Sequence, residues 1–328
     1  MKHLFLFSII LFVFSCHSPQ SPETIEIPEE IKEYLSQYEP YEMTFDGSVY
    51  NNTDKQILKN LVKAARYLDT IYWLQTSEYG LEIRDSLYNA EPGPLRDALL
   101  TLVNRNGGTF ELLNDYEAFY GDQEYYGGEE LYPRGMSVAQ FDAYVEKLPA
   151  EERAEFMYPY TVIREDGSGG YKAVRYHEVY KEYITPIVKL LNETAALSDN
   201  ESFAKFLRLK AEALTTDNYF DADVAWIEVE DSKFDVVFGP FETYSDRIKG
   251  VKAKYEAYIE IVDQEASADL EIYKSYLQKM EENLPIPGAY KSVVEGLTAN
   301  FVIVRDIIRT GEGAVGYQAV AANLPNDP

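Results

Sequence analysis

Apolar residues recur at helical spacing through the first two thirds of the chain. After Thr53-Asp54-Lys55-Gln56, which resembles an N-cap with Gln at the capping-box position, apolar side chains fall at every third or fourth position from 57 to 74. The same spacing predicts further helices over residues 94–103, 137–147, 149–157, 176–197, 200–214 and 267–283. Pro285 and Pro287 end the last of these. The N-terminal portion is therefore predicted to be mainly helical.

The period of the pattern shortens from 3.6 to 2 after about residue 224. Alternating or β-branched apolar runs predict strands over residues 224–230, 234–238, 258–262, 301–308 and 317–322. Asp231-Ser232 is predicted to form a hairpin turn, and residues 311–313 separate the last two strands. Residues 107–135 are rich in Gly, Tyr and Asp and predict long loops, while residues 166–170 predict a turn between extended segments. The expected class is α+β, with a helical N-terminal portion and a small antiparallel β-barrel or sheet flanked by helices.

The first residues have the pattern of a bacterial lipoprotein signal. A short basic start precedes an apolar run over residues 4–14, which is too short to span a bilayer. The run closes on Val13-Phe14-Ser15-Cys16, where cleavage before Cys16 would free its thiol and amine for acylation. The alternative is an ordinary cleaved signal followed by a chance Cys. We expect a signal over residues 1–16, a polar tether over 17–30 and a globular part over 31–328, anchored by Cys16 in the bacterial cell envelope.

Composition excludes several classes of function. The 328 residues carry a net charge of −26, which repels phosphates, so nucleic acid is not expected as a partner. The single Cys excludes an intramolecular disulfide and a thiolate metal cluster. The 28 tyrosines suit core packing as well as peptide or carbohydrate clefts, and composition leaves both uses open.

The usual catalytic motifs are missing from the sequence. A hydrolytic zinc site normally takes two His from one helix turn with a Glu beside them, but the three His are His3, His17 and the isolated His177. The sequence contains neither a Gly-x-Ser-x-Gly elbow nor a phosphate-binding loop. Acidic pairs such as Asp221/Asp223 and Glu228/Glu230 are expected by chance in a chain with 56 Asp and Glu. We therefore expect no metal site within this chain.

One stretch suggests ligand binding. Residues 239–247 follow a buried-type strand that Gly239-Pro240 is expected to end, and Glu242 and Tyr244 lie two positions apart. In an extended segment these two side chains point to the same side. A carboxylate and a phenol placed together can hold the ammonium group and a carbonyl oxygen of one small ligand. The residues equally allow an exposed Glu and a packed Tyr at a strand end.

Several segments, in the same order, resemble the dipeptidyl peptidase III family of zinc metallopeptidases, most closely its bacterial members. Residues 226–229 and 235–244 resemble the family's strand and its Glu-Ser/Thr-Tyr motif, here with Thr243. Residues 255–258 resemble its next aromatic-acidic strand, and Asn323-Leu324-Pro325-Asn326 resembles its Asn-x-Pro-Asn motif. The resemblance covers the chain from about residue 30 to its end.

The resemblance implies a two-lobed enzyme in which a peptide with a free N-terminus adds as a strand to the edge of a small barrel. It implies that Glu242 binds the amino group, that Tyr244 donates a hydrogen bond near the scissile carbonyl, and that Asn323 and Asn326 bind the peptide backbone and its N-terminal end. The family's zinc ligands lie beyond the Asn-x-Pro-Asn motif, so zinc is expected in a full-length parent and not on this chain. We therefore expect the chain to be incomplete at its C-terminus.

Two hypotheses follow. The first is the substrate-binding lobe of a lipid-anchored zinc dipeptidyl peptidase-like hydrolase, inactive as it stands. The second is a non-catalytic surface lipoprotein that binds peptide or glycan through the Tyr-rich loops around residues 116–132.

Overall fold

The computed structural model describes residues 26–328 except 275, 292–300, 318, 323 and 325–328. The described part of the chain forms helices α1 (Glu29–Leu35), α2 (Asn52–Thr76), α3 (Glu78–Asn89), α4 (Pro94–Asn106), α5 (Val138–Val145), α6 (Ala150–Met157), α7 (Tyr176–Val179), α8 (Lys181–Leu197), α9 (Glu201–Thr216), α10 (Phe220–Ile227), α11 (Gln264–Ala268), α12 (Glu271–Lys274) and α13 (Leu277–Glu282). Its strands are β1 (Phe110–Glu111), β2 (Glu117–Ala118), β3 (Thr161–Glu165), β4 (Tyr171–Arg175), β5 (Phe234–Glu242), β6 (Lys254–Asp263) and β7 (Ile303–Gly311). The predicted α+β class is confirmed.

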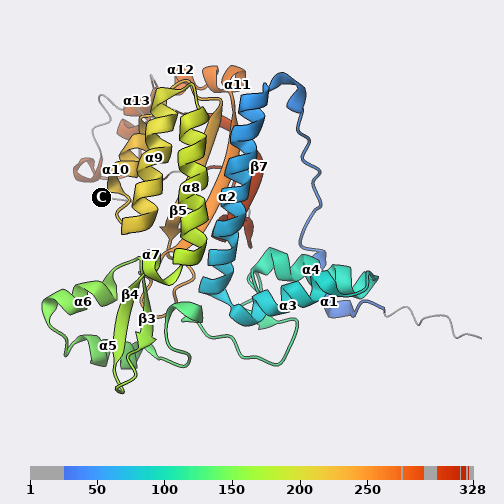
Figure 1. Ribbon diagram of the computed structural model, residues 1–328, viewed down its shortest axis with the longest axis vertical. Coiled ribbons are helices and arrows are strands. Elements are labelled where there is room, and N and C mark those ends of the chain that lie inside the picture. The colour runs from blue at the N-terminus through green and yellow to red at the C-terminus, as the bar shows by residue number, and fades with distance from the viewer. Residues whose placement is uncertain (1–25, 275, 292–300, 318, 323, 325–328) are drawn as a thin grey trace, which may run out of the picture.

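A three-stranded antiparallel sheet forms one layer, in the order β5-β6-β7. Figure 1 shows α2, α8 and α9 side by side along this sheet. Val236 of β5 pairs with Ile259 of β6, which pairs with Ile308 of β7. Because side chains alternate across a strand, this row packs into the main core with α2, α8 and α9.

Helix α2 begins with a capping box formed by Asn51 and Asp54. The Asn51 side chain accepts a hydrogen bond from the Asp54 amide, and the Asp54 carboxylate accepts one from the Asn51 amide. This capping box lies two residues before the one predicted at Thr53. Beyond it the predicted apolar face is buried, with Leu61 and Leu68 fully inaccessible to solvent.

Two smaller units flank this core (Figure 1). Helices α1, α3 and α4 pack on the end of α2 around a second apolar cluster that includes Trp73 and Leu102. The β3–β4 hairpin, whose turn is the predicted turn at residues 166–170, lies beside α5 and α6. Helix α3 was not predicted.

The predicted strand at residues 224–230 is wrong, because most of it lies in helix α10. Ala222 and Ala225, three positions apart, face the core, and Asp223 between them forms an ion pair with Lys210 of α9. That spacing fits a helix and overrides the short alternating run. Accordingly Asp231-Ser232 joins a helix to β5 and does not form a hairpin turn.

Other boundaries differ from expectation. Strand β5 continues through Gly239-Pro240 as far as Glu242, with a bulge between Pro240 and Glu242. The predicted helix over 176–197 is divided at Tyr180 into α7 and α8, and the one over 267–283 is replaced by short helices, α11 to α13. The described residues of 317–322 form no strand. No helix in the described part is long and apolar enough to cross a membrane.

Candidate functional site

The end of β5 brings Glu242 and Tyr244 together. Among the strands that the structure describes, β5 pairs only with β6, so it is an edge of the sheet. The Tyr244 side chain is 78% exposed just beyond this edge. The Glu242 carboxylate accepts a hydrogen bond from the phenol, which raises the pKa of Tyr244. The predicted juxtaposition of a carboxylate and a phenol is therefore present.

Two buried carboxyl groups lie behind this pair. Burial raises the pKa of Glu256 in β6 to about 7, although its carboxylate accepts a hydrogen bond of 3.0 Å from the Tyr258 hydroxyl. Burial also raises the pKa of Glu312, which follows β7. The negative charge of Glu242 adds to the rise at both groups. This end of the sheet therefore gathers three carboxyl groups, and burial favours the protonated, neutral form of Glu256 and Glu312 over what is usual for a glutamate.

Lys254 is a buried cation in the same region. It pairs with Glu242 across the β5–β6 ladder, and its side chain is 1% exposed. Its ammonium group forms an ion pair with Glu129 and donates a hydrogen bond of 3.0 Å to the Thr76 hydroxyl. The positive charge of Lys254 also lowers the pKa of Glu312 and so offsets part of the rise that burial causes there.

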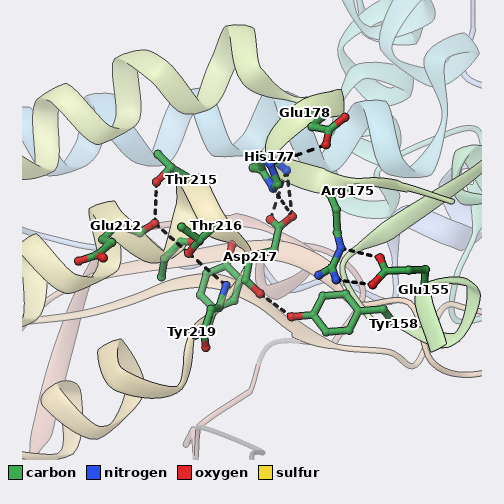
Figure 2. A network of polar contacts seen from close by, with 12 residues as sticks. Glu155, Tyr158, Arg175, His177, Glu178, Glu212, Thr215, Thr216, Asp217 and Tyr219 are labelled. Atoms are coloured by element: carbon green, nitrogen blue, oxygen red, sulfur yellow. Dashed lines mark hydrogen bonds and ion pairs between the residues drawn. The ribbon is translucent and has the colours of Figure 1, made fainter. Parts of the chain in front are cut away.

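His177 belongs to a structural network (Figure 2). Its Nδ1 lies 2.7 Å from a carboxylate oxygen of Asp217, and its backbone amide donates to the same carboxylate. Asp217 caps α9 in the left-handed conformation, and burial raises its pKa while the hydrogen bonds from His177 lower it. Tyr158 donates a hydrogen bond of 2.6 Å to the Asp217 carbonyl oxygen, and the Arg175 guanidinium lies 3.7 Å from the Tyr158 ring centre. The network joins the β3–β4 hairpin to α9, as Figure 2 shows.

The described residues do not fit a catalytic zinc ion. They contain no group of three or more His, Cys, Asp or Glu side chains placed to hold a metal. The imidazole of His177 already contacts Asp217. No step of a reaction is therefore assigned to a metal here.

Two of the remaining acidic candidates, Asp223 and Glu228, have structural partners. Asp223 lies 2.6 Å from the Lys210 ammonium in the core, and Glu228 lies 2.8 Å from Lys205 at the surface. Cys16, Asn323 and Asn326 lie outside the described residues.

The Tyr-rich loops pack largely on themselves. Tyr116 and Tyr125 stack with ring centres 4.0 Å apart, and the Arg247 guanidinium lies 4.7 Å from the Tyr116 ring centre. Both tyrosines line a pocket together with Glu129. Because each ring covers a face of the other, this pair offers less surface for sugar stacking than two free tyrosines would.

Sequence reasoning missed Lys254, Glu312 and Asp246, whose roles depend on tertiary contacts. One signal was available: charged residues at 252, 254, 256 and 260 interrupt an apolar strand. Buried charges need partners, so such interruptions mark places where other elements supply them.

Comparisons with known proteins agree with this picture. Residues 162–294 match the family model described as Peptidase family M49. The structure of DPP III from Caldithrix abyssi superimposes with a TM-score of 0.82 at 35% identity, covering 90% of this chain and 56% of that one. The structure of dipeptidyl-peptidase III from Corallococcus sp. strain EGB superimposes with a TM-score of 0.83 at 28% identity, covering 92% of this chain and 56% of that one.

A plant protein is also similar. The chain is 27% identical over 346 residues to Nudix hydrolase 3 of Arabidopsis thaliana, with 90% of this chain and 44% of that protein covered. The chain thus spans about half the length of the relatives it matches. Over that part, its sequence and fold are those of the dipeptidyl peptidase III family of metallopeptidases.

Proposed function

We propose that this chain binds the N-terminal end of a peptide, as the substrate-binding part of a dipeptidyl peptidase-like hydrolase. The observation that carries the proposal is the contact between Glu242 and the exposed phenol of Tyr244 at the end of an edge strand. The family match supports it, because residues 162–294 include both groups.

Each group has a definite role in this proposal. Glu242 binds the peptide's ammonium group through a hydrogen bond between charged groups. Once the ammonium group occupies Glu242, the phenol of Tyr244 donates its single O–H to a peptide carbonyl oxygen near the N-terminus in place of Glu242. The peptide backbone pairs with the open edge of β5, as in other complexes in which a strand is added to a sheet. Asn323 and Asn326 add backbone contacts.

Cutting the peptide is not assigned to these residues. Hydrolysis in a full-length relative would use a zinc ion, whose ligands the described residues do not provide. We expect the purified chain with added zinc to leave dipeptidyl arylamides intact. Turnover that is abolished by a chelator would contradict this part of the proposal.

Calorimetry with the purified chain tests the binding role. A tetrapeptide with a free N-terminus should bind, and its N-acetylated form should bind about 10- to 100-fold more weakly, because a hydrogen bond between charged groups is worth about 1.5–3 kcal/mol. Glu242→Gln should lower affinity for the free peptide to a similar extent.

The matched control is Glu228→Gln, which removes one negative charge at a surface site. It should leave affinity nearly unchanged. Equal binding of the free and acetylated peptides would overturn the proposal.

The proposal includes attachment to the bacterial cell envelope through acylated Cys16. Its motivation is the sequence at residues 13–16. Labelling of cells with an alkyne fatty acid should mark the wild-type protein and not Cys16→Ser, and equal labelling of both would refute the anchor.

A further inference from the structure

The loop between β5 and β6, residues 243–253, is held by one buried carboxylate. Asp246 is 6% exposed and accepts hydrogen bonds from four backbone amides of its own loop. One carboxylate oxygen accepts from the amides of residues 248 and 249, at 2.9 and 3.1 Å. The other accepts from the amides of residues 251 and 252, both at 2.9 Å. A single side chain therefore accepts hydrogen bonds from four backbone amides of the loop.

The same carboxylate joins the loop to a distant part of the chain. The hydroxyl of Tyr132 donates a hydrogen bond of 2.9 Å to Asp246. Tyr132 is 2% exposed, and its ring packs edge-on against Phe141 of α5 with centres 5.6 Å apart. The amide of Arg247 also donates to the carbonyl oxygen of Gly127. The loop is therefore hydrogen-bonded to the segment of residues 127–132 at both ends of that segment.

A buried lysine fixes the other end of the loop. The Lys252 side chain is fully buried, and burial lowers its pKa to about 7. Its ammonium group donates to the carbonyl oxygens of Phe156 and Tyr158, at 2.8 and 2.7 Å, and to the Thr161 hydroxyl at 2.6 Å. All three ammonium donors are therefore satisfied by the adjoining α6–β3 segment.

Tyr244 is the exposed aromatic residue of the same loop. Tyr244 lies two residues before Asp246, whose amide donates to the carbonyl oxygen of Thr243. The backbone is fixed on both sides of Tyr244, yet its side chain remains 78% exposed. A fixed backbone under an exposed phenol lowers the entropy lost when that phenol binds a ligand.

We propose that Asp246, through Tyr132 and the loop amides, is a positioning residue that holds the Tyr244 phenol ready for the peptide. This inference rests on the function proposed above. Asp246 does not touch the peptide but acts through Tyr244. Lys252 and Tyr132 are two of the attachments that keep its loop in place.

The test uses Tyr132→Phe, because Asp246→Asn could prevent folding. The substitution removes one hydroxyl and keeps the ring packed on Phe141. Hydrogen exchange at the amides of residues 248, 249, 251 and 252 should become at least tenfold faster. Affinity for the free tetrapeptide should fall about fivefold.

Tyr126→Phe is the matched control. Its hydroxyl donates to the carbonyl oxygens of Pro133 and Met136 and not to the loop. It should leave both the loop amides and the affinity within twofold of wild type. In a Tyr244→Phe background, Tyr132→Phe should no longer weaken binding, because the phenol through which it acts is gone.

The outcomes separate the two proposals. If wild type binds the peptide but Tyr132→Phe and Tyr126→Phe change affinity alike, the positioning role is wrong and the binding role stands. The same conclusion follows if Tyr132→Phe weakens binding equally with and without the Tyr244 hydroxyl. If wild type does not bind any free N-terminus, the proposed function itself fails.

Discussion

The ion pair between Lys210 and Asp223 gives the sharpest prediction about the core next to the site. The Lys210 ammonium lies 2.6 Å from the Asp223 carboxylate, and the two residues are 1% and 5% exposed. The ammonium also lies 5.2 Å from the ring centre of Phe241, the residue before Glu242. Lys210→Met removes the positive charge, keeps a side chain of similar length, and leaves a carboxylate buried beside rings.

Protonation of Asp223 limits how much free energy of unfolding the Lys210→Met variant can lose. Breaking a buried pair costs about 3–5 kcal/mol when one charge stays behind. At pH 7 Asp223 in the variant can lose its charge by binding a proton, which costs about 4 kcal/mol for a group with an ordinary pKa near 3.9. That cost falls by about 1.4 kcal/mol for each pH unit below 7, because the folded variant then holds a proton that the unfolded chain lacks.

Urea unfolding at pH 5, 6 and 7 measures this directly. The free energy of unfolding of Lys210→Met should be about 3–4 kcal/mol lower than that of wild type at pH 7 and about 1.5 kcal/mol lower at pH 5. The double variant Lys210→Met/Asp223→Leu should recover most of the loss at pH 7, since it leaves no buried charge. A loss at pH 7 below about 1 kcal/mol, or one that does not change with pH, would refute this account.

Two further predictions concern β6. Burial raises the pKa of Glu256 from 4.5 to about 7, so the folded chain keeps a proton that the unfolded chain releases between these values. In urea titrations, the free energy of unfolding of wild type should therefore fall by about 2–3 kcal/mol relative to that of Glu256→Gln as pH rises from 4.5 to 7.5. The same pH dependence of this free energy in both proteins would contradict the prediction. Gln75 of α2, fully buried, accepts a hydrogen bond of 2.9 Å from the Tyr255 amide. Gln75→Leu should lower the free energy of unfolding by about 1–3 kcal/mol because that amide loses its partner, and a midpoint unchanged from wild type would show that water replaces it.

The sequence was most informative where local chemistry decides the structure. Helix α4 begins at Pro94 and α5 follows the N-cap Ser137, as predicted, because Pro at the first turn and Ser at an N-cap act within a few residues. The long apolar face of α2 was equally clear, since a 25-residue helix gives a sustained period. The contact of Glu242 with Tyr244 could also be predicted from their separation of two positions, although β5 ends at Glu242 and Tyr244 lies in the turn that follows and not in an extended segment.

Prediction failed where distant residues decide. Residues 224–230 alternate like a strand, but Lys210 and the core around Ala222 and Ala225 favour the helix. The carboxylates behind Tyr244 were missed because Glu312 reaches the site from the end of β7. Asp246 has no local signal in the sequence, and only its five donors, one of them 114 residues away in sequence, show what it does.

Strand β6 and the residues just before it carry two buried lysines, Lys252 and Lys254, whose ammonium groups have their partners in distant parts of the chain. Lys252 depends on residues 156–161, and Lys254 depends on α2 and Glu129. A sheet that formed without these neighbouring elements would therefore leave the ammonium groups of both lysines without hydrogen-bond acceptors. We expect the helical layer and the sheet to fold and unfold as one cooperative unit, so that proteases find either the intact chain or small peptides and no stable sheet fragment between them.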